Sequence, residues 1–318
     1  MNEPPIVTPS GIQISYKHYG EQEAPAIILI MGLGASMNVW PEDLIHGLVK
    51  KGFRVILFDN RDVGRSTHLD EHGSPSIITT WLNVRLRRKV CLPYQLDDMA
   101  EDVIALMGGL QIKKAHFVGV SMGGMIAQIL ASKYKNKALS LTSIMSTTNA
   151  LPRPTLKVML NLARRPSVKN AQAVIRYNMK LNRLIGGRKY ASDEPTLYRQ
   201  AVKNTQFGYN PAGIKRQLAA ITASHRHNLV TTIKVPTLVI HGSEDPVIPL
   251  KSGQASADVI RKAKLKIVNG MGHSLPDALA SKLTKWISKH VSKAEKKRRN
   301  KKRKKQPLMK TKFADKSR

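Results

Sequence analysis

The fold is decided by residues 115–125, which read AHFVGVSMGGM. Residues 115–118 have the composition of a strand buried on both faces, and a helical period begins at Met125. Between them, Gly-x-Ser-x-Gly predicts a turn so tight that Gly119 and Gly123 tolerate little or no side chain. Such a turn holds the hydroxyl of Ser121 above the sheet, at the N-terminus of the helix. A plain glycine-serine helix entry without chemistry is the alternative that the pentapeptide leaves open.

Similar runs of β-branched and aliphatic residues occur before and after this turn. They span residues 26–31, 54–58, 139–144, 237–240 and 265–268. We interpret them as strands, most of them buried on both faces. Between them lie segments of helical period, such as the one that places Leu96, Met99 and Val103 on one face. Strands that alternate with helices predict an α/β fold, with a mostly parallel central sheet and helices on both faces.

The alternation is interrupted between residues 147 and 230, where several helices are broken by prolines and by Gly186-Gly187. We interpret this stretch as an inserted helical cap. It carries 15 basic and two acidic residues, so its surface is cationic. The strand pattern then resumes and ends with a helix whose apolar stripe stops at Val291. The predicted domains are a core of residues 1–146 and 231–292, a cap of residues 147–230, and a disordered tail of residues 293–318 that is rich in lysine and arginine.

The 318 residues include 53 Lys and Arg against 21 Asp and Glu, a formal charge of +32. The longest apolar run, residues 26–35, is ten residues long, whereas a membrane-spanning helix needs about 20. The first residues, Met-Asn-Glu-Pro-Pro, lack the basic start and apolar stretch of a signal peptide, so we expect a cytoplasmic protein. Cys91 is the only cysteine, which excludes an internal disulfide and a thiolate metal cluster.

A neutral serine is a weak nucleophile, so it needs a base and a group that orients the base. His273 follows the last predicted strand, and Asp245 follows the strand before it. Both loops are expected at the carboxyl ends of parallel strands, where open α/β sheets bind their ligands. The chain order serine, acid, histidine predicts a catalytic triad of Ser121, Asp245 and His273. Glu244 is the immediate rival of Asp245, and the sequence leaves that choice open.

Acyl transfer also requires N–H donors for the oxyanion of the tetrahedral intermediate, each contributing on the order of 3 kcal/mol. Met31-Gly32-Leu33-Gly34 follows the first long strand, and the glycines on either side of Leu33 free its N–H to point into a cleft. We expect the N–H groups of Leu33 and Met122 to form an oxyanion hole. An ordinary strand-to-loop turn is the alternative.

Taken together, these motifs resemble the α/β-hydrolase superfamily over about residues 10–290. The motifs are MGLG at 31–34, DNRDVGRS at 59–66, the serine turn, HGSEDPVIP at 241–249 and GMGH at 270–273. Within the superfamily the chain is similar to carboxylesterases of the aclacinomycin and rhodomycin methylesterase type, which also begin the oxyanion loop with Met-Gly and follow it with a tryptophan, here Trp40. Many other members have His-Gly at the position of Met31-Gly32. The resemblance implies ester hydrolysis and a structural loop at 59–66, so no catalytic role is assigned to Asp62 or Arg65.

Serine at the turn argues against the dehalogenases and epoxide hydrolases of the superfamily, which use aspartate there. It is compatible with ester, thioester or carbon–carbon hydrolysis, acyl transfer and perhydrolysis. We favour a small-molecule carboxylic ester, cleaved through an acyl-enzyme on Ser121 with His273 as the base and no cofactor.

The net charge of +32 favours a binding function rather than an enzymatic one. Residues 296–305 hold nine cations in ten positions. Like charges at this density repel, which predicts a solvated tail, and the functional alternative is non-specific contact with nucleic acid or an anionic membrane surface. A binding protein on a hydrolase scaffold is therefore the alternative to the esterase. The oligomeric state leaves no signature in the sequence.

Two further motifs are weak. His68-Leu69-Asp70-Glu71-His72 matches a zinc-protease pattern, but Gly73-Ser74-Pro75 directly after it argues against the helix that this pattern requires, and we expect no metal. Gly32-Leu33-Gly34 faintly resembles a dinucleotide site, but Met37 stands where that site needs a small residue. We therefore expect no nicotinamide cofactor.

Overall fold

The structure is a computed structural model that describes residues 3–149, 154–163, 166, 170–207 and 209–305. At its centre lies a seven-stranded sheet in the order β3-β5-β4-β6-β7-β8-β9, in which only β3 runs antiparallel to its neighbour. The strands are β3 (Tyr16–Tyr19), β4 (Ala26–Ile30), β5 (Arg54–Phe58), β6 (Ala115–Val120), β7 (Ala138–Ile144), β8 (Thr237–Gly242) and β9 (Lys264–Val268). Two short strands, β1 (Ile6–Val7) and β2 (Gln13–Ile14), form a separate antiparallel pair. The α/β fold expected from the sequence is confirmed.

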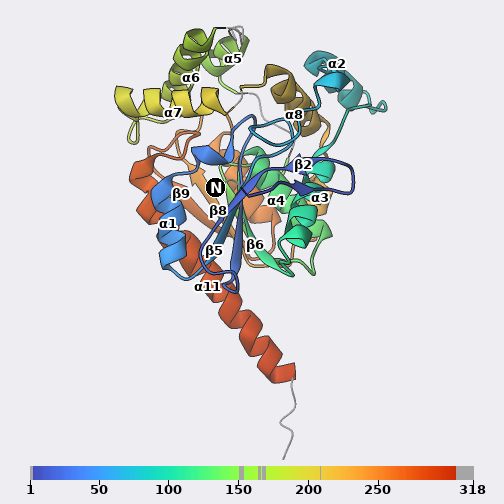
Figure 1. The fold of residues 1–318 in the computed structure, drawn as a ribbon, viewed down its shortest axis with the longest axis vertical. Helices are drawn as coiled ribbons and strands as arrows, with labels where there is room; N and C mark the ends of the chain where they lie inside the picture. Colours follow the sequence, from blue (N-terminus) through green and yellow to red (C-terminus); the bar gives the residue numbers. More distant parts are fainter. Residues whose placement is uncertain (1–2, 150–153, 164–165, 167–169, 208, 306–318) are drawn as a thin grey trace, which may run out of the picture.

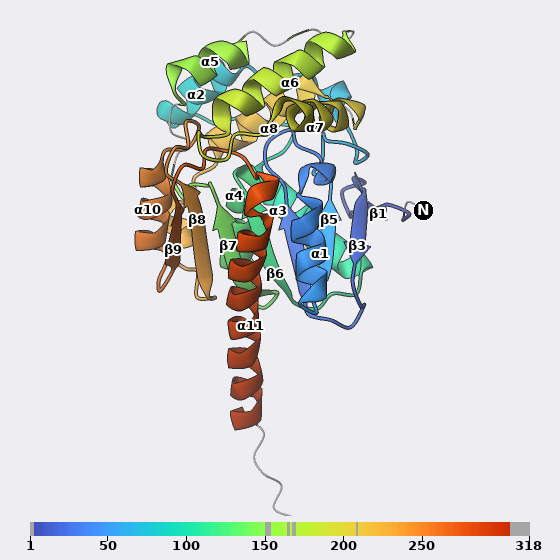
Figure 2. The same ribbon diagram turned by 90° about the vertical axis from the view of Figure 1, so that its left-hand side faces the viewer.

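The sheet separates two apolar cores, because successive residues of each buried strand face opposite sides. In β4, Ile28 and Ile30 contribute to one core, and Ile27 and Leu29 contribute to the other. Helices α3 (Leu96–Gly109) and α4 (Met122–Lys133) cover the first face, and α1 (Glu42–Lys50) and α11 (Ala280–Lys305) cover the second (Figure 2). Helix α10 (Leu250–Val259) packs against β8 and β9.

A layer of helices lies over one end of the sheet (Figure 1). It contains α5 (Leu156–Ala163), α6 (Ala171–Ile185), α7 (Glu194–Gln206) and α8 (Pro211–Ala223); the four-residue α9 (His227–Val230) follows and packs against α4. Asn170, Asp193 and Asn210 cap α6, α7 and α8 by accepting a hydrogen bond from a backbone N–H of the first turn. Pro195 and Pro211 lie in the first turns of α7 and α8, so these two prolines begin helices as well as separate them.

Helix α2 (Ile77–Arg85) also lies at the cap end, although it comes from a segment that we assigned to the core. It packs against α8 of the cap. Three short 3-10 helices complete the structure: η1 (Met37–Val39), η2 (Asp70–His72) and η3 (Asp277–Leu279).

A buried ion pair joins α8 to the loop after β5. The guanidinium of Arg216 donates to both carboxylate oxygens of Asp62, at 2.8 and 2.6 Å, and both side chains are fully buried. Tyr94 donates a third hydrogen bond to Asp62. Burial alone would raise the pKa of Asp62, but the hydrogen bonds from Arg216, Leu69 N–H and Tyr94 outweigh burial and lower it. The loop that we expected to be structural therefore anchors a cap helix.

The predicted start of the tail at residue 293 is wrong, because α11 continues to Lys305. Ala294 and Glu295 are buried, and Glu295 lies 3.3 Å from His116 of β6. Residues 293–305 contain no glycine or proline, and lysine and arginine are good helix formers. Since packing has already nucleated the helix, it extends at little further cost. The rest of the predicted tail, residues 306–318, lies outside the described residues.

Within the described ranges, no helix is both long and apolar enough to cross a membrane.

Candidate active site

The turn between β6 and α4 presents Ser121 in a strained backbone conformation. Its φ is 53° and its ψ is −118°, a combination that residues with a side chain rarely adopt. A Cβ atom on Gly119 would lie 2.1 Å from the carbonyl oxygen of Gly123, and one on Gly123 would lie 2.1 Å from that of Ile30. Both glycines are therefore required for the turn to pass between strand and helix, as the pentapeptide predicts.

Three side chains predicted to act together lie within hydrogen-bond reach. The Nε2 atom of His273 is 3.0 Å from Oγ of Ser121, and its Nδ1 atom is 2.7 Å from Oδ2 of Asp245. Each residue follows the carboxyl end of a different strand: β6, β8 or β9. These strands come together only in the folded sheet, where β7 separates β6 from β8.

Asp245, and not Glu244, faces the imidazole. Its side chain is fully buried, and its Oδ1 accepts hydrogen bonds from the N–H groups of Val247 and Ile248, at 2.9 and 2.8 Å. Burial would raise the pKa of Asp245, but His273 and the hydrogen bonds around the carboxylate outweigh burial and hold it well below the ordinary value. Asp245 is therefore ionised at neutral pH. Glu244 instead pairs with the exposed Arg188 of the cap.

The loop that contains Leu33 passes directly beside Ser121. A Cβ on Gly32 would lie 3.2 Å from the Cβ of Ser121. The loop is held by Asn60, whose Nδ2 donates to the carbonyl of Met31, and by Gln217 of α8, whose Oε1 accepts the N–H of Gly34 at 2.8 Å. No pattern in the sequence indicates this role of Gln217, because its partner lies 183 positions away.

Met122 is the first residue of α4. At this position a backbone N–H has no intrahelical acceptor, so it is free to bind another group. Leu33 and Ser121 line one cavity, and the N–H of Met122 follows the serine directly in the chain. The two expected oxyanion donors thus belong to segments that both adjoin Ser121.

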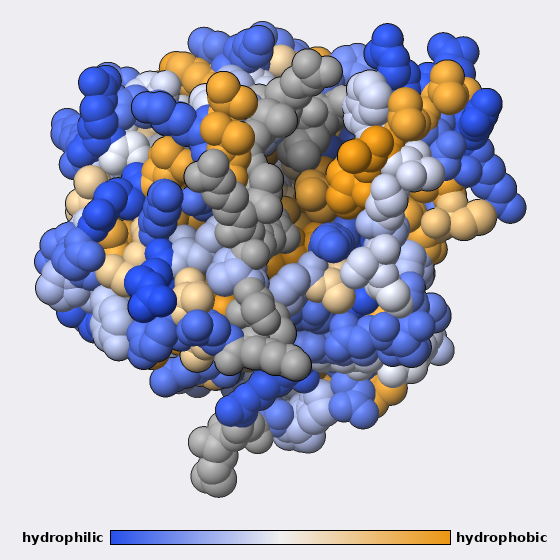
Figure 3. Space-filling view, turned by 90° about the horizontal axis from the view of Figure 1, so that it is seen from above, coloured by the Kyte–Doolittle hydropathy of each residue, from blue (hydrophilic) through white to orange (hydrophobic). Residues whose placement is uncertain are grey.

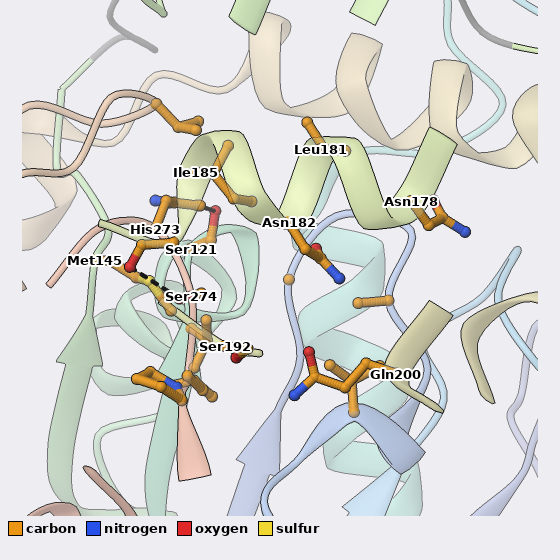
Figure 4. A pocket seen from close by; sticks show the side chains of 18 of the residues that line it. Ser121, Met145, Asn178, Leu181, Asn182, Ile185, Ser192, Gln200, His273 and Ser274 are labelled. Carbon is orange, nitrogen blue, oxygen red and sulfur yellow. Dashed lines mark hydrogen bonds between the residues drawn. The ribbon is translucent and has the colours of Figure 1, made fainter. Parts of the chain in front are cut away.

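The cavity above Ser121 has a volume of about 290 Å³, and helix α6 of the cap runs along it (Figure 4). Its walls near the serine are mostly apolar. Farther away, α6 and α7 contribute four carboxamide side chains, those of Asn178, Asn182, Gln200 and Asn204. These amide groups make no hydrogen bond to another described residue, and Nδ2 of Asn178 is buried without a partner. Within the described residues, no carboxylate lines the cavity.

The cap is joined to the loop of His273 through the backbone. The N–H of His273 donates to the carbonyl of Ile185 at 2.6 Å, and that of Gly272 donates to Gly186 at 3.1 Å. Gly187 has a φ of +81°, and a Cβ there would lie 2.3 Å from the nitrogen of Gly272. The sequence shows Gly186-Gly187 only as a helix break, but in the structure this pair allows the end of α6 to approach the imidazole.

The structure does not form the helix that the zinc-protease pattern of residues 68–72 requires. Residues 70–72 form only the short η2, and Nε2 of His68 contacts the carbonyl oxygen of Gly64. Among the described residues, no group of three or more His, Cys, Asp or Glu side chains is arranged to hold a metal ion.

Comparison with known proteins agrees with the fold and the motifs. Residues 25–277 match the family described as alpha/beta hydrolase fold. Rhodomycin D methylesterase DnrP of Streptomyces peucetius is 24% identical over 300 residues, which cover 87% of this chain and 94% of that protein. The bifunctional esterase/perhydrolase DCH of Acinetobacter calcoaceticus is 26% identical over 297 residues, covering 88% and 96%.

Among solved structures, the enol-lactonase from Burkholderia xenovorans LB400 superposes with a TM-score of 0.71 at 23% identity, covering 91% of this chain and all of that one. The family match spans most of the chain and includes the serine turn and the loops of Asp245 and His273. The chain is therefore a member of the α/β-hydrolase fold family.

Proposed function

We propose that this protein hydrolyses carboxylic esters through an acyl-enzyme, with Ser121 as nucleophile, His273 as general base and Asp245 as the group that orients the imidazole. The observation that carries the proposal is the continuous chain of short contacts from Ser121 Oγ through both imidazole nitrogens to the buried carboxylate of Asp245. The esterases, methylesterase and enol-lactonases among the relatives support ester hydrolysis as the reaction class.

In the proposed reaction, Nε2 of His273 accepts the proton of Ser121 as its Oγ attacks the ester carbonyl. The ionised Asp245 keeps the remaining imidazole proton on Nδ1 and stabilises the imidazolium. The N–H groups of Leu33 and Met122 bind the oxyanion, each contributing on the order of 3 kcal/mol. His273 then protonates the leaving alcohol, and water repeats the sequence on the acyl-enzyme. Every step uses groups of this chain alone.

The cavity favours esters that have a hydrogen-bonding group remote from the scissile bond. Figure 4 shows Ser121 and His273 at one end of the cavity and Asn178 toward the other. Carboxamides both donate and accept hydrogen bonds, and the four carboxamide side chains that line the cavity have no partner among the described residues. A carbonyl or hydroxyl oxygen of the substrate would accept a hydrogen bond from an amide that faces the cavity. We therefore propose a substrate with such an oxygen, separated from its ester group by an apolar segment.

The test is covalent labelling with a fluorophosphonate, followed by kinetics on p-nitrophenyl esters. We expect the label on Ser121, and we expect Ser121→Ala to abolish labelling and to lower turnover by several orders of magnitude. Ser274→Ala is the matched control, because Ser274 lines the same cavity and should leave labelling intact. Unchanged turnover in Ser121→Ala would refute the proposal.

We also propose that the basic end of α11 binds polyanions. Figures 1 and 2 show α11 projecting from the end of the sheet opposite to the cap. Where it leaves the body, a groove of about 460 Å³ is lined by four cations, Arg54, Lys113, Lys114 and Arg298, and by two carboxylates, Glu23 and Glu295, of which Glu295 pairs with Arg298. Arg54 is buried, its Nε has no partner, and it forms no ion pair with a described residue. Deleting residues 296–318, which keeps the buried Ala294 and Glu295, should abolish salt-sensitive binding to duplex DNA and spare ester cleavage, whereas undiminished binding would contradict the proposal.

A further inference from the structure

Helix α2 exposes its apolar side to solvent. The one residue of α2 that is fully buried is Thr80, whereas Ile78, Trp81 and Leu82 are 73, 44 and 43% exposed. With Leu86 at the helix end, 55% exposed, they fall at positions i, i+3, i+4 and i+8, which is the spacing of a single helical face. A surface helix ordinarily packs such a face against the core. No described residue therefore gives this face the apolar cover that its composition calls for.

Exposed apolar side chains are concentrated at this end of the molecule. Among the described residues, nine large hydrophobic side chains are exposed, and six of these lie on α5 or on α2 and its C-terminal residue. The two on α5 are Leu156 and Leu160. Figure 3 looks onto the cap and shows apolar side chains gathered on the right-hand side, over α2, among strongly polar ones. An exposed apolar patch such as the one over α2 marks an interaction site.

Cations accompany the apolar face of α2. Arg85, Arg87, Arg88 and Lys89 are all exposed, and no acidic residue occurs between positions 76 and 90. The guanidinium of Arg85 lies 5.8 Å from the ring centre of Trp81, so charge and aromatic ring share one face. An apolar helix face that contains tryptophan and is flanked by several cations has the composition of helices that lie in the interface of anionic membranes.

The position of this surface connects it to the cavity. Leu156 and Leu160 are exposed on α5, while Val158 between them is 1% exposed and lines the cavity above Ser121. Helix α2 packs on α8, whose Gln217 binds the loop of Leu33. A surface bound through α2 and α5 would therefore lie at the cap end, on the side from which the cap covers the active site.

We infer that the cap end binds anionic membrane surfaces, with Ile78, Trp81, Leu82 and Leu86 inserted below the headgroups and the cations of residues 85–89 bound to the phosphates. The charge of the cap favours an anionic membrane over a second copy of the chain as the binding partner, because the cap has 15 basic residues and only two acidic ones. Two such surfaces repel each other, whereas an anionic bilayer complements both the charge and the apolar face. The inference adds a location to the proposed esterase and does not depend on its catalytic mechanism.

The experiment measures partitioning of the full chain onto vesicles of phosphatidylcholine with and without phosphatidylserine. We expect binding that requires phosphatidylserine, a blue shift of Trp81 fluorescence, and quenching by brominated lipid that is lost in Trp81→Phe. Ile78→Ser/Leu82→Ser and Arg87→Glu/Arg88→Glu should each weaken partitioning by about tenfold or more. These side chains are exposed, and an unchanged thermal unfolding transition would show that the variants fold.

Two controls separate this surface from other parts of the chain. Val7→Ser/Ile267→Ser removes two exposed apolar side chains elsewhere and should leave partitioning unchanged. Deletion of residues 296–318 removes more cations than the arginine variant does and keeps the buried Ala294 and Glu295, and it should retain lipid insertion of Trp81. The inference is overturned if the serine variant of α2 binds like the unmodified chain, or if only the deletion abolishes binding. It is also overturned if light scattering shows a dimer that the α2 variant dissociates, since a second copy would then cover this face.

Discussion

Replacing Asp245 by asparagine tests whether this carboxylate orients the base. Asparagine has nearly the same size as aspartate, but it offers one acceptor oxygen, whereas both oxygens of Asp245 accept hydrogen bonds in the structure. Oδ1 accepts the N–H groups of Val247 and Ile248, and Oδ2 faces Nδ1 of His273. If the amide oxygen of asparagine turned toward His273, two backbone donors would lose their acceptor, at about 1–3 kcal/mol each. The amide oxygen should therefore stay with the backbone, and the NH₂ group should face the imidazole.

An NH₂ group at that position requires Nδ1 of His273 to accept a hydrogen bond, so the imidazole proton moves to Nε2. The nitrogen that must take the proton of Ser121 then already holds one. We expect kcat/KM of Asp245→Asn to fall by about 10,000-fold, the effect of the wrong tautomer in serine hydrolysis, which corresponds to about 5.5 kcal/mol of transition-state stabilisation. Glu244→Gln, at the neighbouring carboxylate, affects only an exposed pair with Arg188 and should change kcat/KM by about twofold at most.

The assay is hydrolysis of p-nitrophenyl acetate, with active-site titration to count competent sites and thermal unfolding to confirm that each variant folds. Both substitutions remove one negative charge and retain nearly the same volume, so each is a control for the other. The reasoning would be refuted if folded Asp245→Asn kept more than about a tenth of the activity, or if Glu244→Gln lost as much as Asp245→Asn.

Three further predictions follow from buried or cavity-lining groups. Arg216→Met leaves Asp62 as an unpaired buried carboxylate and should lower the free energy of unfolding by about 3–5 kcal/mol in a urea titration, whereas a loss below about 1 kcal/mol would contradict that accounting. Asn182→Leu should raise KM about two- to tenfold for esters with a remote carbonyl and leave KM of alkyl esters of equal length unchanged; a uniform change would argue against recognition by this amide. Burial lowers the pKa of His290 from 6.5 to about 4. Between pH 6.5 and pH 4 the imidazole is therefore protonated in the unfolded chain and neutral in the folded one. The free energy of unfolding should fall by about 3 kcal/mol as the pH falls through this window. His290→Gln should show a shallower loss of stability over the same window, and identical pH profiles would sink this assignment.

Most of the fold was predictable because its signals are local. A strand buried on both faces needs only a run of four to six apolar residues, and every long strand except β3 was expected within about two residues of its observed bounds. Strand β3, Tyr16–Tyr19, was missed because it is an edge strand with Lys17 and His18 at its centre and contains no apolar run. The serine turn was readable for the same local reason, since Gly119 and Gly123 stand where any side chain would collide with backbone.

The end of α11 was predicted wrongly because repulsion between cations was considered without the propagation of a helix that is already nucleated. Repulsion between cations argued for a disordered segment from residue 293. The structure continues the helix to Lys305, after the packing of Leu283, Ile287 and Val291 has fixed its first turns. Charge repulsion acts at every residue, but once a helix is nucleated each added residue gains a hydrogen bond.

The amino-acid sequence alone determined the α/β class, the serine turn, and the order of serine, acid and histidine along the chain, because each of these depends on residues within one strand, one turn or one loop. The tertiary structure alone decided that Asp245 faces His273 while Glu244 faces Arg188, that Gln217 holds the loop of Leu33, and that α2 exposes Trp81 to solvent. These outcomes depend on contacts between segments 28 to 183 positions apart, and on which side of a helix meets its neighbour. Such distances are set by the packing of the whole chain, and no local pattern encodes them.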